Sequence, residues 1–147
     1  MKKEYSDEEF DKLKTKVLKY ILYSKRTEND IRKKFLSDEG QMLDDVIEYL
    51  KEAGYINDVI YVEKAVNEFL NLKNLSIREL EYKLLQKGID KNIVDEYIYE
   101  NREKLLDYEI NSARNLANKK SNKEQDEIKR YLLNKGYMSE TLDIIFE

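Results

Sequence analysis

Cysteine, proline and histidine are absent from this chain of 147 residues. Without cysteine there can be no disulfide and no thiol chemistry, and without cysteine and histidine the common zinc sites lose their usual ligands. Without proline, nothing interrupts the interior of a helix. We therefore expect a helical protein with no catalytic cysteine or histidine, no bound metal and no cofactor.

Three further features are missing. The four glycines are isolated, so no glycine-rich phosphate loop is present. No run of Val, Ile and Thr alternates with period two, which argues against strands. The amino-terminal lysines are followed by acids, and no apolar stretch is long enough for a secretory signal or a membrane span. These absences predict an all-α, cytoplasmic protein that contacts no membrane.

Acidic pairs are the remaining candidates for catalysis. Asp44 and Asp45 are adjacent, as are Asp95 and Glu96. Adjacent residues of a helix do not face one pocket, so these pairs are expected on a solvated surface. We predict that the chain has no catalytic residue and is not an enzyme.

The glycines recur at a regular spacing. Gly40, Gly88 and Gly136 are 48 residues apart, and each of these glycines, like Gly54, follows a leucine by four positions. Glycine favours the left-handed conformation that ends a helix. The leucine then lies in the last turn of that helix, where an apolar residue that follows the glycine can pack against it. The spacing predicts helix ends at all four glycines and a helical repeat of about 48 residues.

Helix starts fit the same repeat. Ser6, Ser76 and Ser121 each precede a glutamate by three residues, the pattern of a capping box, and Thr27 resembles another helix start. The apolar spacing predicts about nine helices, in the order long, short, short within each repeat. We expect three tandem three-helix repeats, at 1–56, 57–103 and 104–147, that form an elongated, curved array and a monomer.

Charge is unevenly distributed although the net charge is only −4. Residues 10–36 contain nine Lys or Arg against three Asp or Glu, residues 37–70 contain two against nine, and residues 112–136 contain seven against three. The basic residues cluster on the predicted middle helices and could line up as a stripe that binds phosphate or an acidic protein groove. An ordinary solvated face is the alternative. The candidate binding residues are Arg32, Lys33, Lys34, Lys83, Lys119, Lys120, Lys129 and Arg130.

Four stretches of the sequence resemble the RecX family, bacterial regulators of the RecA recombinase. The stretch GYINDVIYV at 54–62 resembles the family's segment joining two helical units, and ELEYKLLQKGID at 79–90 resembles its Glu-Leu and Lys-Gly-Ile run. The stretch ARNLANKK at 113–120 resembles its Ala, Leu-Ala and Lys-Lys motif, and YLLNKGY at 131–137 resembles its closing Phe-Leu and Arg-Gly-Phe motif.

The resemblance implies a function as well as a tandem helical fold. A RecX-like protein would bind along the groove of the RecA filament, with the DNA inside the filament as a further contact. It would inhibit the filament's ATPase and strand exchange in homologous recombination, DNA repair and the SOS response, and would itself catalyse nothing.

Two other classes fit the helices. A three-helix unit with a short turn also suits helix-turn-helix binding of free duplex DNA, which would weaken steeply with salt. The acidic isoelectric point of about 5.2 argues against strong DNA binding by the chain alone. A general helical adaptor for another protein is the second alternative.

Overall fold

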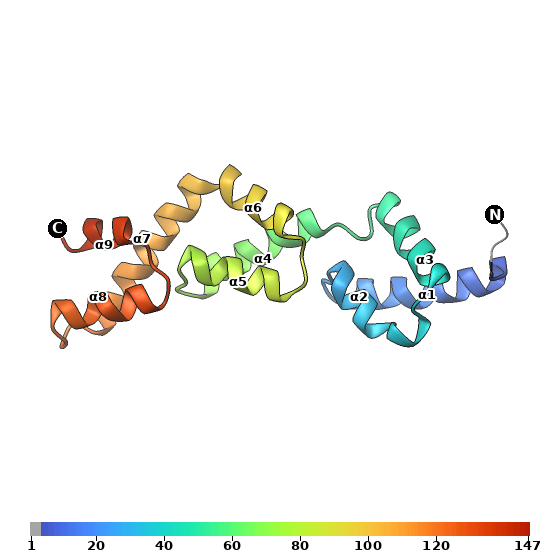
Figure 1. Cartoon of the computed structure of the whole chain (residues 1–147), viewed down its shortest axis with the longest axis horizontal. Helices are drawn as coiled ribbons and strands as arrows, with labels where there is room; N and C mark the ends of the chain where they lie inside the picture. Colours follow the sequence, from blue (N-terminus) through green and yellow to red (C-terminus); the bar gives the residue numbers. More distant parts are fainter. Residues whose placement is uncertain (1–3) are drawn as a thin grey trace. The chain divides into compact units, whose positions relative to one another are not determined.

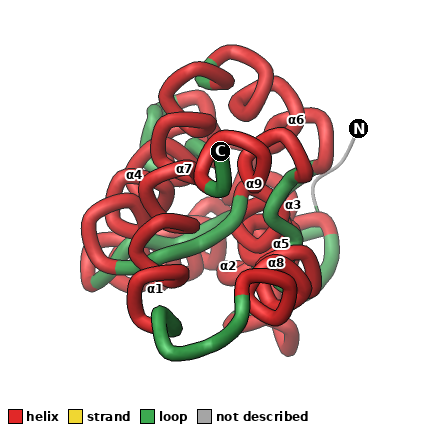
Figure 2. Tube along the Cα trace, turned by 90° about the vertical axis from the view of Figure 1, so that its left-hand side faces the viewer, coloured by secondary structure: helices red, strands yellow, loops and turns green. Residues whose placement is uncertain are grey.

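The computed structural model describes residues 4–147, and these residues form nine α-helices, one short 3-10 turn and no strand (Figures 1 and 2). The all-α fold class is confirmed. The helices are α1 (Asp7–Tyr23), α2 (Glu28–Lys34), α3 (Gln41–Glu52), α4 (Asp58–Leu72), α5 (Ile77–Gln86), α6 (Lys91–Glu100), α7 (Arg102–Lys119), α8 (Gln125–Asn134) and α9 (Ser139–Ile145), and the 3-10 turn spans Leu36–Asp38.

The chain forms two compact units that interleave in sequence. Unit 1 comprises the described residues up to Tyr61 together with Lys87–Ile89, and unit 2 comprises Val62–Gln86 and Asp90–Glu147. The three repeats expected from the sequence, and their curved arrangement, stay predictions.

Unit 1 has a core shared by α1, α2 and α3. Leu13 and Val17 of α1, one helical turn apart, pack with Ile31 of α2 and with the apolar face of α3 that includes Val46 and Ile47. Val17, Ile31 and Val46 are completely buried. The amphipathic spacing of these helices therefore accounts for the core of this unit.

Unit 2 is organised around α7, which packs against α5, α6 and α9. Its carboxy-terminal core combines Ala113 of α7 with Ile128 and Leu132 of α8 and Leu142 of α9. Glu109 of α7 is also completely buried. This carboxylate accepts a hydrogen bond of 3.0 Å from the backbone N–H of Ile77, the first residue of α5, and another from the hydroxyl of Thr141 in α9.

Local capping signals explain most helix boundaries. Ser6 forms the predicted reciprocal capping box with Glu9, and Thr27, which was predicted as a helix start, forms another with Asp30. Ser76 does the same with Glu79 at the start of α5. At the ends of α3 and α8 the backbone shows the bonds of a Schellman motif, with Tyr55 N–H donating to Leu50 and Tyr137 N–H donating to Leu132 at 2.8 and 3.1 Å.

Two predicted boundaries are wrong. Helix α2 ends at Lys34, and a 3-10 turn separates it from Gly40, which is the N-cap residue of α3. The reason is the extra residue in this segment, which leaves room for an additional turn before the glycine. Ser121 forms no capping box, because it lies in the turn after α7 and the next helix begins only at Gln125.

A contact between helix ends occurs twice, and we name each occurrence a glycine joint. In the first joint, inside unit 1, the Thr27 hydroxyl donates to the Lys87 carbonyl at 3.2 Å and Lys87 Nζ lies 4.0 Å from Asp30. Gly88 follows with φ +76°, so close to Asn29 that an added Cβ would lie 2.6 Å from the Asn29 Cβ. The turn after α5 is thus seated on the capping box of α2.

The second joint, inside unit 2, repeats this chemistry. The Ser76 hydroxyl donates to the Lys135 carbonyl at 2.8 Å, and Lys135 Nζ lies 3.7 Å from Glu79. Gly136 has φ +98°, and an added Cβ would lie 3.0 Å from the Arg78 Cβ. The turn after α8 is seated on the capping box of α5 in the way that the turn after α5 is seated on α2.

Candidate interaction surface

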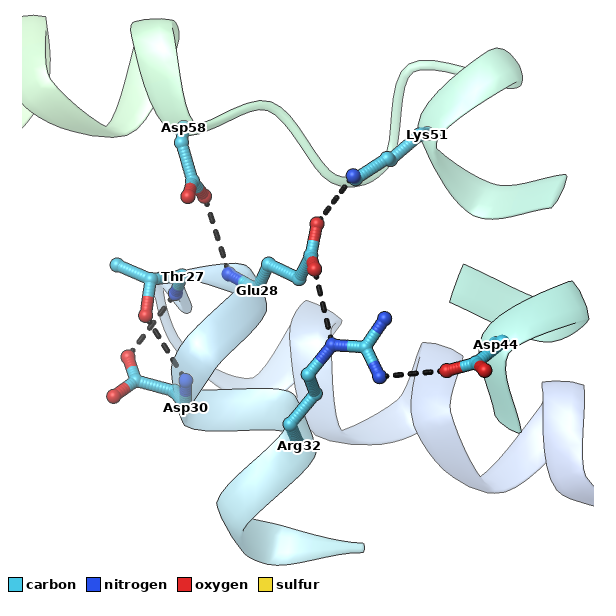
Figure 3. A network of polar contacts seen from close by, with 7 residues as sticks. All are labelled: Thr27, Glu28, Asp30, Arg32, Asp44, Lys51 and Asp58. Atoms are coloured by element: carbon cyan, nitrogen blue, oxygen red, sulfur yellow. Dashed lines mark hydrogen bonds and ion pairs between the residues drawn. The ribbon is translucent and has the colours of Figure 1, made fainter. Parts of the chain in front are cut away.

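Arg32 belongs to an ion-pair network within unit 1 (Figure 3). Its Nε lies 3.0 Å from Glu28 and its Nη1 lies 2.7 Å from Asp44, so this residue ties α2 to α3. Glu28 also pairs with Lys51 of α3, and the backbone N–H of Glu28 donates to Asp58 at 3.1 Å. Arg32 was predicted to bind a partner, yet the structure commits its guanidinium to two carboxylates of the same unit.

The network shifts two carboxyl groups in opposite directions. Burial acts to raise the pKa of Glu28, but hydrogen bonds from Lys51 and Arg32 outweigh it and bring that pKa below its usual 4.5. Burial raises the pKa of Asp58 above 3.8, and the N–H of Glu28 offsets only part of this effect. Glu28 is therefore the carboxylate whose charge the network stabilises.

We expect Glu28→Gln to lower the free energy of unfolding by about 1 kcal/mol at neutral pH. Because the pKa of Glu28 is lower in the folded protein, its ionised form adds stability above pH 4.5 that is lost as the pH falls through the folded value. The difference between parent and variant should therefore be smaller at pH ~3 than at pH ~7.

Urea unfolding at both pH values measures this difference. Part of the raised pKa of Asp58 comes from the charge of Glu28, so the comparison is made in a background in which both proteins carry Asp58→Asn. A difference that stays constant between the two pH values would contradict the assignment.

The other predicted residues of α2 lie on the surface of unit 1. Lys33 and Lys34 are exposed, and Lys34 Nζ lies 5.8 Å from the centre of the Tyr20 ring. The structure therefore leaves these two lysines accessible, in contrast to Arg32.

Unit 2 brings basic side chains together around Tyr131 of α8. Lys120 Nζ, at the end of α7, lies 4.3 Å from the centre of the tyrosine ring, and Lys135 Nζ, after α8, lies 5.5 Å from it. Ammonium groups are attracted to the face of an aromatic ring, which fixes two flexible lysines on one surface. Lys120 was predicted from the sequence, whereas Tyr131 and Lys135 were not.

A shallow hollow in unit 2 continues this surface. It is lined by Arg78, Tyr82 and Lys83 of α5 and by Lys135 and Gly136 after α8. Its acidic lining residue is Glu79, which is already engaged by Lys135 and by the Ser76 N–H. We name the set Arg78, Lys83, Lys120, Tyr131 and Lys135 the basic surface of unit 2.

Three predicted residues lie outside this set. Lys129 is half-buried, with Nζ 5.4 Å from the centre of the Phe146 ring. Lys119 and Arg130 are exposed. No group of three or more acidic side chains that could hold a metal ion occurs among residues 4–147, and no helix in that range is long and apolar enough to cross a membrane.

Fold and surface define an all-helical protein whose basic surface in unit 2 is formed by α5, by α8 and by the residues that follow α7 and α8. The chain is 32% identical over 142 residues to the regulatory protein RecX of Clostridium beijerinckii, covering 90% of this chain and 66% of the relative. It is 31% identical over 132 residues to RecX of Staphylococcus carnosus, covering 86% and 49%. The chain belongs to the RecX family.

Solved structures agree with the sequence relatives. The crystal structure of RecX from Lactobacillus salivarius matches with a TM-score of 0.80 at 27% identity and covers 96% of both chains. No protein-family model matches the sequence. The chain spans between about half and two thirds of the length of the two RecX relatives described above.

Proposed function

We propose that this chain binds the RecA recombinase filament on DNA and inhibits its ATPase and strand exchange during recombination and DNA repair. Membership of the RecX family carries this proposal. The chain would act as a cytoplasmic monomer and as a regulator without catalytic activity of its own.

The basic surface of unit 2 is the proposed contact. Lys83 and Lys120 can neutralise phosphates or acidic side chains, and Tyr131 holds Lys120 and Lys135 on this surface. The whole chain is acidic, with a net charge of −4, which disfavours tight binding of free DNA. A filament presents both protein and nucleic acid, so a small basic surface can be supplemented there by protein contacts.

The direct test is the rate of ATP hydrolysis by RecA on single-stranded DNA with increasing amounts of this protein. We expect the rate to fall with concentration, while the protein alone hydrolyses no nucleotide. Unchanged ATPase, strand exchange and filament lifetime over a wide range of ratios would reject the function. Equal affinity for free duplex DNA and for the filament would instead favour the helix-turn-helix alternative.

The contact surface makes a separate prediction. Lys120 belongs to the basic surface of unit 2, and its sequence neighbour Lys119 is exposed although it lies outside that set. Replacing both, as Lys119→Glu and Lys120→Glu, should weaken filament binding most at low salt, because a screened attraction is lost. If both lysines meet phosphates, the slope of log affinity against log salt should fall by about two. Helix content should stay unchanged, since lysine and glutamate have similar helix propensity.

A matched control changes the net charge by the same amount at two lysines of unit 1. Lys12 and Lys16 are exposed on α1, so Lys12→Glu with Lys16→Glu alters the net charge equally. Fluorescence anisotropy of labelled filaments at two salt concentrations compares the two variants. If only the α1 variant loses affinity, the contact lies on unit 1 rather than on the basic surface of unit 2.

A further inference from the structure

The glycine joints use the middle helices α2, α5 and α8 in series, which leaves two unused ends. The capping box of α2 receives the turn after α5, and the capping box of α5 receives the turn after α8. The start of α8 and the turn after α2 take part in neither joint.

At the unused start of α8, the capping residue has no hydroxyl group of the kind that both joints use. Thr27 and Ser76 donate to the incoming carbonyl, but the residue at the same place is Glu124, which makes no capping bond and cannot donate when ionised. Glu127 occupies the place of Asp30 and Glu79, the acids that pair with the incoming lysine. Glu124 and Glu127 are both exposed.

In the unused turn after α2, an acidic residue stands in the place of the lysine. Lysine precedes the glycine in both joints, at Lys87 and Lys135, whereas Glu39 precedes Gly40. Glu39 and Gly40 are exposed, and nothing lies within 4 Å of a Cβ added to Gly40. The extra residue and the 3-10 turn also change the shape, since the φ of Gly40 is +144° against +76° and +98° in the joints.

We propose that these two ends are incompatible with each other and thereby prevent a second copy of the chain from adding end to end. A joint between copies would place Glu39 against Glu127 where the two existing joints place lysine against an acid. Like charges at such a contact oppose association, and no hydroxyl would be present to bind the carbonyl. A contact between two different ends does not close on itself, so an unblocked joint would lead to open-ended assemblies.

Restoring the joint chemistry at both ends tests this proposal. The converted variant lacks Ser37 and carries Asp38→Gln, Glu39→Lys and Glu124→Ser, which recreates a Gln-Lys-Gly turn and a serine cap. A second variant carries only Glu39→Lys and Glu124→Ser. Its matched control carries Glu52→Lys and Glu96→Ser, an equal change of charge at exposed positions.

Weak association can be trapped because the chain has no cysteine of its own. Gln41→Cys, next to Gly40, and Asp126→Cys, in the place of Asn29 and Arg78, are added to the parent, the two variants and the control. We expect about tenfold or more disulfide-linked oligomer from the converted variant than from the parent or control. The second variant should fall between them, and sedimentation should show mass rising with concentration for the converted variant.

Two results would overturn the proposal. One is a parent with natural charges that yields as much linked oligomer as the converted variant. The other is a converted variant that keeps its circular dichroism spectrum yet gives neither linked oligomer nor rising mass. Neither result depends on RecA, so the outcome is separate from that of the proposed function.

Discussion

Replacing Glu109 by alanine should lower the free energy of unfolding of unit 2 by about 2–4 kcal/mol. The carboxylate is completely buried and accepts hydrogen bonds from the Ile77 N–H and the Thr141 hydroxyl. Alanine would leave both donors buried without an acceptor and would open a cavity between α5, α7 and α9. The large effect comes from the two orphaned donors more than from the lost bonds themselves.

Hydrogen exchange at the Ile77 amide and urea unfolding together measure this effect. Glu109→Gln is the matched control, because it keeps the volume and one acceptor oxygen, and we expect a smaller loss. Thr141→Val removes one of the two donors and should cost less than Glu109→Ala. Equal stability of the alanine and glutamine variants would contradict the cost assigned to the orphaned donors.

Gly88→Val is expected to destabilise unit 1 by about 2–4 kcal/mol, from two sources. A β-branched residue is strained at φ +76°. In addition, its Cβ would meet the Asn29 side chain, with the Asn29 Cβ only 2.6 Å away, so the first glycine joint could not close without displacement.

Gly54 separates the two sources. Its φ of +84° imposes similar strain, but nothing lies within 4 Å of its added Cβ. In urea unfolding, the free energy of unfolding of Gly88→Val should therefore be well below that of Gly54→Val. Adding Asn29→Ala to Gly88→Val should recover part of the difference. Equal losses at Gly54 and Gly88 would show that the close approach to Asn29 contributes nothing.

The features predicted correctly from sequence are those set by neighbours along the chain. The capping boxes at Ser6 and Ser76 were predictable because the serine and glutamate that bond each other are three residues apart. Ser121 has the same spacing but no box, since the turn that ends α7 extends through it. Gly40 shows a similar limit, because one additional residue converts a helix end into a 3-10 turn.

The contacts of a surface charge depend on tertiary partners that the sequence does not reveal. Arg32 looks like its basic neighbours in the sequence, but Asp44 of another helix binds its guanidinium. Tyr131 and Lys135 gave no separate signal, although Lys135 lies in the basic segment 112–136, because their role depends on Lys120 and on the hollow beside α5. Charge clustering therefore indicates a region of the chain, whereas the contacts of single side chains come from the structure.

Each glycine joint connects residues that are made at different times, because they are far apart in the sequence. The Thr27 hydroxyl bonds to a carbonyl 60 residues later, and the Ser76 hydroxyl to one 59 residues later. At a translation rate of about 5–20 residues per second, Lys87 is added roughly 3–12 s after Thr27. The capping box of Thr27 and Asp30 joins residues three positions apart, so its own hydrogen bonds need no residue that is made later. Unit 1 is complete only after α4 and α5 have been made, and the nascent chain therefore carries part of unit 2 before unit 1 is finished.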